Sequence, residues 1–175
     1  MHKTTYNLCI VLLLILGSNL VQAQQFRMGN KELTFELPNH LWHEAKVDSN
    51  MKINMHRTVF KREAVEVANR VLVIPNIEIV IEKTPYSLSS FSGMKQSAIK
   101  IKIDSNLYLK NGKLMLAGSK GYFGHYVRNN TMYKMCIIHC VYNGYGAQII
   151  LDCTADVFDE VWVEFRYFVE SLKLE

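Results

Sequence analysis

Alternating apolar and polar residues predict strands in the first half of the chain. In residues 32–37, Leu33, Phe35 and Leu37 fall on one side and charged or hydroxyl residues on the other, the pattern of a half-buried strand. Residues 71–83 alternate in the same way, with Pro75 marking an edge or a bulge, and residues 52–61 form a weaker strand. These segments predict a sheet with one apolar face.

Two neighbouring segments have no clear period. Residues 39–48 are polar apart from Trp42, and we expect a loop or a single helical turn whose indole covers the core. Residues 62–70 fit either one short helix or the arms of a loop, because so short a segment does not let periodicity decide.

Apolar residues at helical spacing predict two helices. The first covers residues 87–102, with Ser87 or a neighbouring serine as its N-cap, although its tail from 99 to 104 alternates like a strand. The second begins near Asp156 as its N-cap and carries a broad apolar stripe. We expect this closing helix to bury Phe158, Trp162 and Phe165 against the sheet.

The segment between the helices predicts an antiparallel meander. Residues 113–155 contain three or four apolar strands, separated by Gly118, by the asparagine pair at 129–130 and by Asn143-Gly144. Turns as short as these make neighbouring strands antiparallel.

The turn at Asn143 also sets the register of the cysteines. A four-residue turn over 143–146 places Cys136 opposite Cys153, close enough to form a disulfide. A two-residue turn instead places Cys140 opposite Ala147. Both registers are open at this point, and we expect reduced thiols because an odd cysteine count after residue 23 argues against a disulfide framework.

The first 23 residues have the pattern of a secretory signal peptide. His2 and Lys3 form a basic start, residues 8–16 are an unbroken apolar run, and residues 21–23 place small side chains where a signal peptidase cleaves. We therefore expect an exported chain, periplasmic or secreted, that begins at Gln24. The apolar run is shorter than the roughly 20 residues of a membrane-spanning helix, so no transmembrane segment is expected after cleavage.

Composition indicates one folded domain over residues 24–175. The chain is 49% apolar and 21% charged, without an internal repeat or linker. A domain of this length buries roughly 70% of its unfolded surface, enough for one core without metal or disulfides. The order of elements predicts an α+β fold, a curved antiparallel sheet with helices packed on its faces. Losing Lys3 lowers the formal net charge from +4 to +3, too little to indicate nucleic-acid binding.

Charge is distributed unevenly along the chain. Residues 95–134 hold eight basic residues and one acid, Asp104, whereas residues 152–175 hold seven acids and two basic residues. If the basic residues cluster, they form a surface for an anionic partner. Alternatively, they are only the solvated exterior of the strands and helices. The candidate binding residues are Lys95, Lys100, Lys102, Lys110, Lys113 and Lys120.

No common catalytic motif is present: the chain has no G-x-S-x-G, H-E-x-x-H, P-loop or G-x-G-x-x-G. His40 and His43, followed by Glu44, are weak candidates for a metal site, since their spacing on a helical turn brings both imidazoles to one ion. A zinc enzyme needs a third protein ligand, which His56 or His125 would have to supply. We expect no cofactor.

A cysteine nucleophile is not expected either. On an extended strand, His139 points to the face opposite Cys136 and Cys140, so the histidine cannot activate either thiol. We interpret these cysteines as small buried hydrophobic residues and expect no catalytic residue.

Five stretches of the chain resemble the PsbP/DcrB-like family. They are residues 35–42 (FELPNHLW), 74–82 (IPNIEIVIE), 120–126 (KGYFGHY), 145–159 (YGAQIILDCTADVFD) and 171–174 (SLKL). They look especially like small uncharacterised secreted proteins of Bacteroidetes-type bacteria. The resemblance implies a PsbP-like α/β/α sandwich. Because members of this family are chiefly accessory, adaptor or chaperone-like binding proteins, it also implies no enzymatic activity.

Together these observations predict an exported, non-enzymatic accessory or binding protein of the bacterial cell envelope. Its expected partner is an envelope protein or an anionic surface. One alternative is a metal-dependent envelope hydrolase that uses His40 and His43. Another is a chaperone or immunity protein for a secreted effector, which the sequence does not distinguish from the first hypothesis.

Overall fold

The computed structural model describes residues 23–46, 55–67, 70–99, 101–108 and 116–175. The strands are β1 (Ala23–Met28), β2 (Lys31–Glu36), β3 (Trp42–Ala45), β4 (Met55–Arg62), β5 (Val65–Val67), β6 (Val71–Val73), β7 (Asn76–Lys83), β8 (Lys102–Asn106), β9 (Ser119–Arg128), β10 (Thr131–Tyr142), β11 (Tyr145–Thr154) and β12 (Lys173–Leu174). The helices are α2 (Leu88–Ile99) and α3 (Ala155–Ser171). This confirms the predicted α+β class, a mostly antiparallel sheet with two helices.

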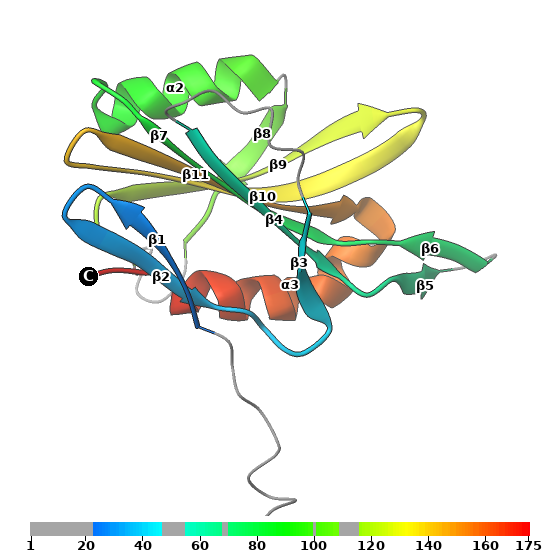
Figure 1. Ribbon diagram of the computed structural model, residues 1–175. Helices are drawn as coiled ribbons and strands as arrows, with labels where there is room; N and C mark the ends of the chain where they lie inside the picture. The colour runs from blue at the N-terminus through cyan, green and yellow to red at the C-terminus, as the bar shows by residue number, and fades with distance from the viewer. Residues whose placement is uncertain (1–22, 47–54, 68–69, 100, 109–115) are drawn as a thin grey trace, which may run out of the picture.

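A seven-stranded antiparallel sheet forms the centre of the molecule, with the strand order β3-β4-β7-β11-β10-β9-β8. A smaller sheet, β1-β2-β12, and the two-stranded ribbon β5-β6 lie beside it (Figure 1). The hairpins β9-β10 and β10-β11 have the longest ladders, because each has a short turn between two long apolar strands. These three strands are the predicted meander.

The main core lies between the large sheet, helix α3 and the small sheet. Phe35 of β2 packs against Phe60 of β4 and Phe168 of α3, with ring centroids 5.7 and 5.0 Å apart. From α3, Phe165 and Phe168 are fully buried there. We call this side of the large sheet the α3 face. It carries the cysteines, isoleucines and leucines of β10 and β11 that alternate inward.

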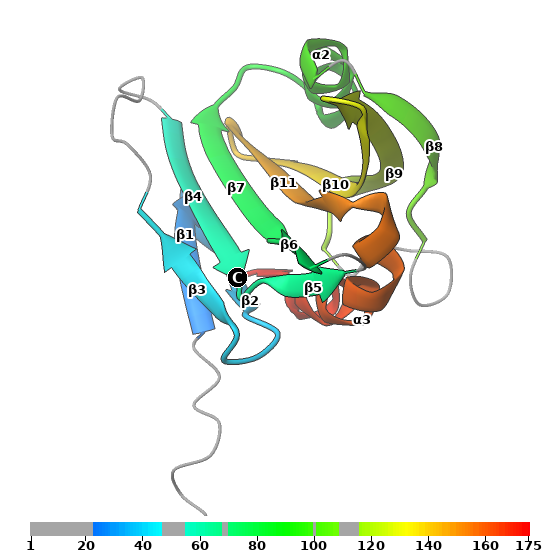
Figure 2. The ribbon, with the colours of Figure 1, turned by 90° about the vertical axis from the view of Figure 1, so that its right-hand side faces the viewer.

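Helix α2 packs on the opposite side, which we call the α2 face (Figure 2). Phe91 is fully buried against the edge of the His139 ring, with centroids 5.8 Å apart. The close approach requires Gly146 on β11, since a Cβ atom there would come within 2.5 Å of the Phe91 ring. The Ser87 hydroxyl accepts the Ser90 backbone N–H at 3.3 Å, which confirms the serine cap.

Four predicted details differ from the structure. Residues 42–45 form strand β3 rather than a loop or helical turn, because Trp42 is buried against Phe165 at 5.7 Å. Helix α2 ends at Ile99, and the alternating tail supplies strand β8 instead. The N-cap of α3 is Thr154 rather than Asp156. Trp162 is only partly buried, whereas Phe158 and Phe165 are buried as predicted.

The open alternatives are resolved as well. The 62–70 segment supplies strand β5, which pairs with β6. At the last hairpin Tyr142 pairs with Tyr145, so the turn is the two-residue one, with Asn143 and Gly144 at φ 46° and 78°.

Cys140 therefore lies opposite Ala147, and Cys136 lies opposite Leu151, not Cys153. The alternative of a four-residue turn with Cys136 facing Cys153 is wrong. Within the described residues, Cys136, Cys140 and Cys153 are free and buried.

Among the described residues, neither helix has the length and apolar character needed to cross a membrane.

Candidate functional site

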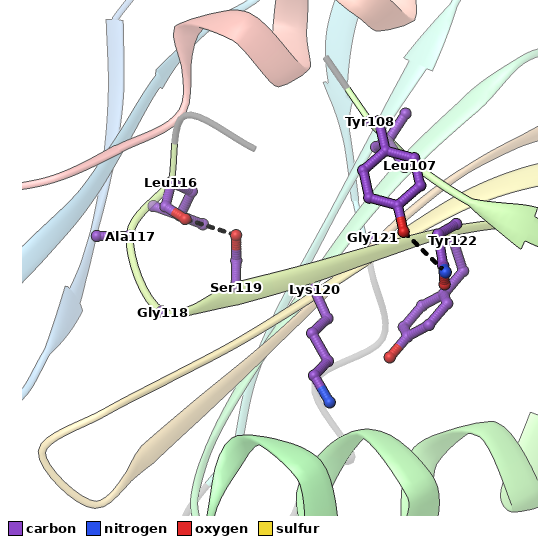
Figure 3. A pocket seen from close by; sticks show the side chains of 10 residues that line it. Leu107, Tyr108, Leu116, Ala117, Gly118, Ser119, Lys120, Gly121 and Tyr122 are labelled. Carbon is purple, nitrogen blue, oxygen red and sulfur yellow. Dashed lines mark hydrogen bonds between the residues drawn. The ribbon is translucent and has the colours of Figure 1, made fainter. Parts of the chain in front are cut away.

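A cavity of about 570 Å³ lies where β8 ends and β9 begins (Figure 3). Residues 106–108 form one wall and residues 116–122 form the other. The Leu107 backbone N–H donates to the Gly121 carbonyl oxygen at 2.8 Å and holds the walls together. Leu107 and Leu116 are buried in the core, so the cavity has an apolar base. We call it the β8–β9 cavity.

Polar side chains of the β8–β9 cavity come from both strands. Lys120 points from β9 toward α2, where its ammonium donates to the Ser89 hydroxyl at 3.1 Å (Figure 3). On the other wall, the Asn106 amide donates to the Tyr108 hydroxyl at 3.1 Å, and 65% of Tyr108 is exposed. No acidic residue is among the described residues that line the cavity. An anionic group would therefore meet the Lys120 charge without a competing carboxylate.

Sequence reasoning selected Lys120 but missed the tyrosines and the asparagine beside it. The available signal was the pair of glycines, Gly118 and Gly121, in a segment that otherwise reads as a strand. Gly118 has φ 65°, a conformation that favours glycine, and Gly121 lies buried against Leu107. Such glycines mark close approaches of backbone.

The other predicted basic residues have different surroundings. The Lys95 ammonium lies 2.8 Å from the Glu82 carboxylate and 5.4 Å from the centroid of the Phe91 ring, so its charge is already paired. Lys102 is exposed at the start of β8 and, within the described ranges, makes no ion pair. Lys100, Lys110 and Lys113 lie outside the described residues. Lys102 lies opposite His125, five positions along β9 from Lys120, so only Lys120 belongs to the cavity. A single basic surface stays a prediction.

The histidines of the predicted metal site are not brought together. His40 is exposed in the turn before β3, and His43 is exposed on β3, opposite Lys61 of β4. His56 contacts the Thr58 hydroxyl at 3.1 Å, and His125 lies on β9, five positions from β3 in the strand order. In the part of the chain that the structure describes, no three His, Cys, Asp or Glu side chains are grouped as metal ligands.

A serine–histidine contact does exist, but it is buried beneath α2. The Ser92 hydroxyl lies 2.9 Å from His139 Nδ1 and 2.9 Å from the Tyr122 hydroxyl, and Gln148 Nε2 lies 3.0 Å from His139 Nε2. His139 is fully buried, and burial together with the Lys95 charge lowers its pKa to about 4. Because Ser92, His139 and Gln148 are buried and bond in a chain that ends at the partly buried Tyr122 hydroxyl, they fix α2 on the sheet rather than present a nucleophile.

The thiols are equally unsuited to nucleophilic chemistry. Burial raises the pKa of Cys140 and of Cys153 to about 12, and it raises the pKa of Cys136 as well. The thiolate is the reactive form, and burial disfavours it. His139 faces away from these cysteines, as predicted, since it lies on the α2 face.

Comparison with known proteins shows the fold. No protein-family model matches the chain. A search of curated proteins finds no match. LpqN of Mycobacterium tuberculosis, described as involved in cell envelope biogenesis, superposes with a TM-score of 0.52 at 12% identity, covering 89% of this chain and 92% of LpqN. The cyanobacterial PsbP (CyanoP) of Synechocystis sp. PCC 6803 gives a TM-score of 0.50 at 12% identity, covering 91% and 96%.

A Bacteroides thetaiotaomicron protein gives a TM-score of 0.47 at 10% identity, covering 88% of this chain and 49% of its own. The chain therefore has a PsbP-like α+β fold, as the resemblance implied, while the likeness to secreted Bacteroidetes proteins stays a prediction.

Proposed function

We propose that this chain is an exported, non-catalytic binding or accessory protein of the bacterial cell envelope, with the α/β/α sandwich of the PsbP/DcrB-like group. The signal-peptide pattern of residues 1–23 supports export. The fold similarity to LpqN, a protein involved in cell envelope biogenesis, supports an envelope role. Both supports are independent of each other, because one rests on the leader and the other on the folded domain.

The β8–β9 cavity carries the proposal. It combines an apolar base, exposed aromatic and amide groups, and the Lys120 ammonium, which is held by a neutral hydroxyl. A pocket with this lining binds through a few oriented polar groups and shape. The partner presents an anionic group, from an envelope protein or an anionic surface, to Lys120.

The absence of catalysis is part of the same proposal. It is supported by the burial of the Ser92–His139 pair and by the buried thiols. Metal analysis of the purified protein tests the alternative of a metal-dependent hydrolase. Stoichiometric zinc that is lost in His43→Ala would overturn the proposal, whereas a metal-free active binding protein supports it.

Export is tested by N-terminal sequencing of protein recovered from the producing cell. Protein that begins at Gln24 in an extracytoplasmic fraction supports the proposal. A retained Met1 in a cytosolic fraction contradicts it.

Binding is tested with two single variants that change the net charge equally. Lys120→Glu reverses the charge in the β8–β9 cavity, and Lys61→Glu reverses an exposed lysine of β4 that does not line it. Retention on the native envelope fraction and on phosphatidylglycerol vesicles is measured at low and high salt. Lys120→Glu should bind about tenfold more weakly and Lys61→Glu should bind like wild type, because only the first variant removes the cation at the cavity. Equal loss in both variants would contradict a localised site.

A further inference from the structure

A second cleft, of about 310 Å³, opens on the α3 face between β9, β10 and the first half of α3. Three aromatic rings line it: Phe123 from β9, and Phe158 and Trp162 from α3. The centroids of Phe123 and Trp162 are 4.9 Å apart, and those of Phe158 and Trp162 are 6.0 Å apart. We call it the aromatic cleft. Its volume is at the lower end of the range for small-molecule sites.

Two rings of the aromatic cleft, Trp162 and Phe123, are less covered than the buried residues of the helix stripe, which include Phe158. One helical turn further along α3, Phe165 is fully buried beneath the small sheet and Trp42. Trp162 and Phe123 lie beyond this cover and are only partly buried. The packing of the core thus leaves ring surface accessible to a ligand at this end of the helix.

Charged groups at the aromatic cleft are mainly acidic. Asp104 of β8 and Asp159 of α3 line it together with one lysine, Lys134 of β10. The Asp104 carboxylate also lies 2.8 Å from Nδ1 of His125, which adds a positive charge only when that ring is protonated. The cleft therefore attracts a cation in preference to an anion.

The chain already shows how an ammonium is held here. The Lys134 ammonium lies 3.2 Å from an Asp159 carboxylate oxygen and 5.9 Å from the centroid of the Phe158 ring. A carboxylate and a ring face within this distance are the two components that attract an organic cation. The exposed fractions of the Lys134 and Asp159 side chains are 40% and 84%, so a ligand can reach this ion pair from solvent.

We propose that the aromatic cleft is a binding site for an organic cation, specifically a ligand with a quaternary ammonium group. The partly buried rings of Trp162 and Phe123 would contact its methyl groups, Asp104 would supply the opposing charge, and the ligand would replace the Lys134 ammonium beside Asp159. The aromatic cleft and the β8–β9 cavity share no lining residue and favour ligands of opposite charge. The experiments below therefore test the cleft independently of the proposed function.

Choline is the probe, and 3,3-dimethyl-1-butanol, which has the same shape without the charge, is its matched control. Binding is followed by NMR through the indole N–H of Trp162, which the conservative variant Trp162→Phe identifies. The Trp42 indole serves as the internal reference, since it is buried and donates to Glu164 at 2.6 Å. Choline should shift the Trp162 signal saturably and bind about tenfold more tightly than the neutral alcohol, a ratio typical of cation–π and charge attraction.

Two variants that each replace an acidic residue by its amide sharpen the test. Asp104→Asn should weaken choline binding several-fold and leave binding of the neutral alcohol unchanged. The control, Glu160→Gln, removes an exposed acid of α3 that does not line the aromatic cleft. Choline should bind this variant as tightly as wild type. Equal affinity for choline and the alcohol, an equal effect of both variants, or no saturable shift of Trp162 would each overturn the proposal.

Discussion

The two faces of the large sheet are built by the same strands but held to their helices in different ways. On the α3 face, β10 and β11 present Ile138, Cys140, Ile149 and Leu151 to the phenylalanines of α3. On the α2 face, the same strands present His139, which bonds to Ser92, the single buried serine of α2, and to Gln148. One face is held chiefly by apolar area, the other by one buried ring, Phe91, and a few directional hydrogen bonds around His139.

The difference follows from how much cover each face has. Helix α3 and the small sheet together bury the α3 face. The stabilising free energy rises with the apolar area that is buried. Helix α2 is shorter and contacts mainly β9 and β10, so the rest of its face carries charged pairs such as Arg57–Glu78, 2.7 Å apart. A short helix with little apolar area needs specific partners to fix its position, since a buried polar group left unpaired is costly.

The largest effect is expected at the centre of the α3 face. Phe165→Ala removes a fully buried ring and should lower the free energy of unfolding by about 3–5 kcal/mol, from lost burial and the remaining cavity. The matched control is Val163→Ala on the exposed side of the same helix, which should change stability by no more than about 0.5 kcal/mol. Urea unfolding measures both, and similar losses in the two variants would contradict the packing described.

A smaller effect is expected on the α2 face. Ser92→Ala deprives His139 and Tyr122 of their hydroxyl partner and should cost about 1–3 kcal/mol, the penalty for leaving buried polar groups unpaired. Ser97→Ala, on the exposed side of α2, is the control and should be nearly neutral. If Ser92→Ala is as stable as this control, hydrogen bonds do not fix α2.

Asp152 on the uncovered part of the α2 face should give a pH-dependent effect. Burial raises its pKa to about 6, although the Tyr126 hydroxyl donates to it at 3.3 Å. A raised carboxyl pKa stabilises the fold below the unfolded value near 4, and this contribution is lost as the pH rises through 6. Asp152→Asn should therefore match wild type below pH 4 and be about 1–2 kcal/mol more stable above pH 6, after allowing for partial solvent access.

The comparison variant for Asp152 is Glu66→Gln, which neutralises an exposed acid on β5. It is measured alongside, so that the effect of removing one surface acid is separated from the effect of removing the Asp152 carboxyl. Unfolding midpoints of both variants and wild type are measured between about pH 4 and 7. A stability difference between Asp152→Asn and wild type that does not change with pH would contradict the raised pKa of Asp152.

The last prediction concerns thiol labelling without reductant, which counts the free cysteines and changes no residue. In the folded protein the three cysteines of the α3 face should react slowly, because they are buried and their pKa values are raised. After unfolding, a chain beginning at Gln24 should take up three alkyl groups, and a chain that retains Cys9 should take up four. A single label, measured by mass, would instead reveal a disulfide.

Much of the fold was predictable because it depends on local pattern. Strands β2 and β7, the closing helix and the Ser87 cap follow from residues close to one another in the chain. Turn chemistry made the two-residue turn at Asn143-Gly144 one of two alternatives, since asparagine and glycine tolerate positive φ. It did not choose between them, because both turn lengths fit the same residues.

Tertiary packing decided the rest. Strand β3 exists because Trp42 is buried against Phe165 and donates to Glu164, a residue far along the chain that Arg62 also binds. Strand β12 exists because β2 offers an edge to pair with. No pattern within a few residues of Trp42 carries this information.

The candidate sites show the same division. The sequence by itself determined that Lys120 belongs to a basic region and that Trp162 belongs to an apolar helix stripe. Only the pairing of β8 with β9 placed Tyr108 and Asn106 beside Lys120, and only the packing of α3 brought Phe123 and Asp104 to Trp162. Periodicity records which face a residue occupies, whereas a binding site depends on which distant faces meet, and that is settled by the burial of the whole core.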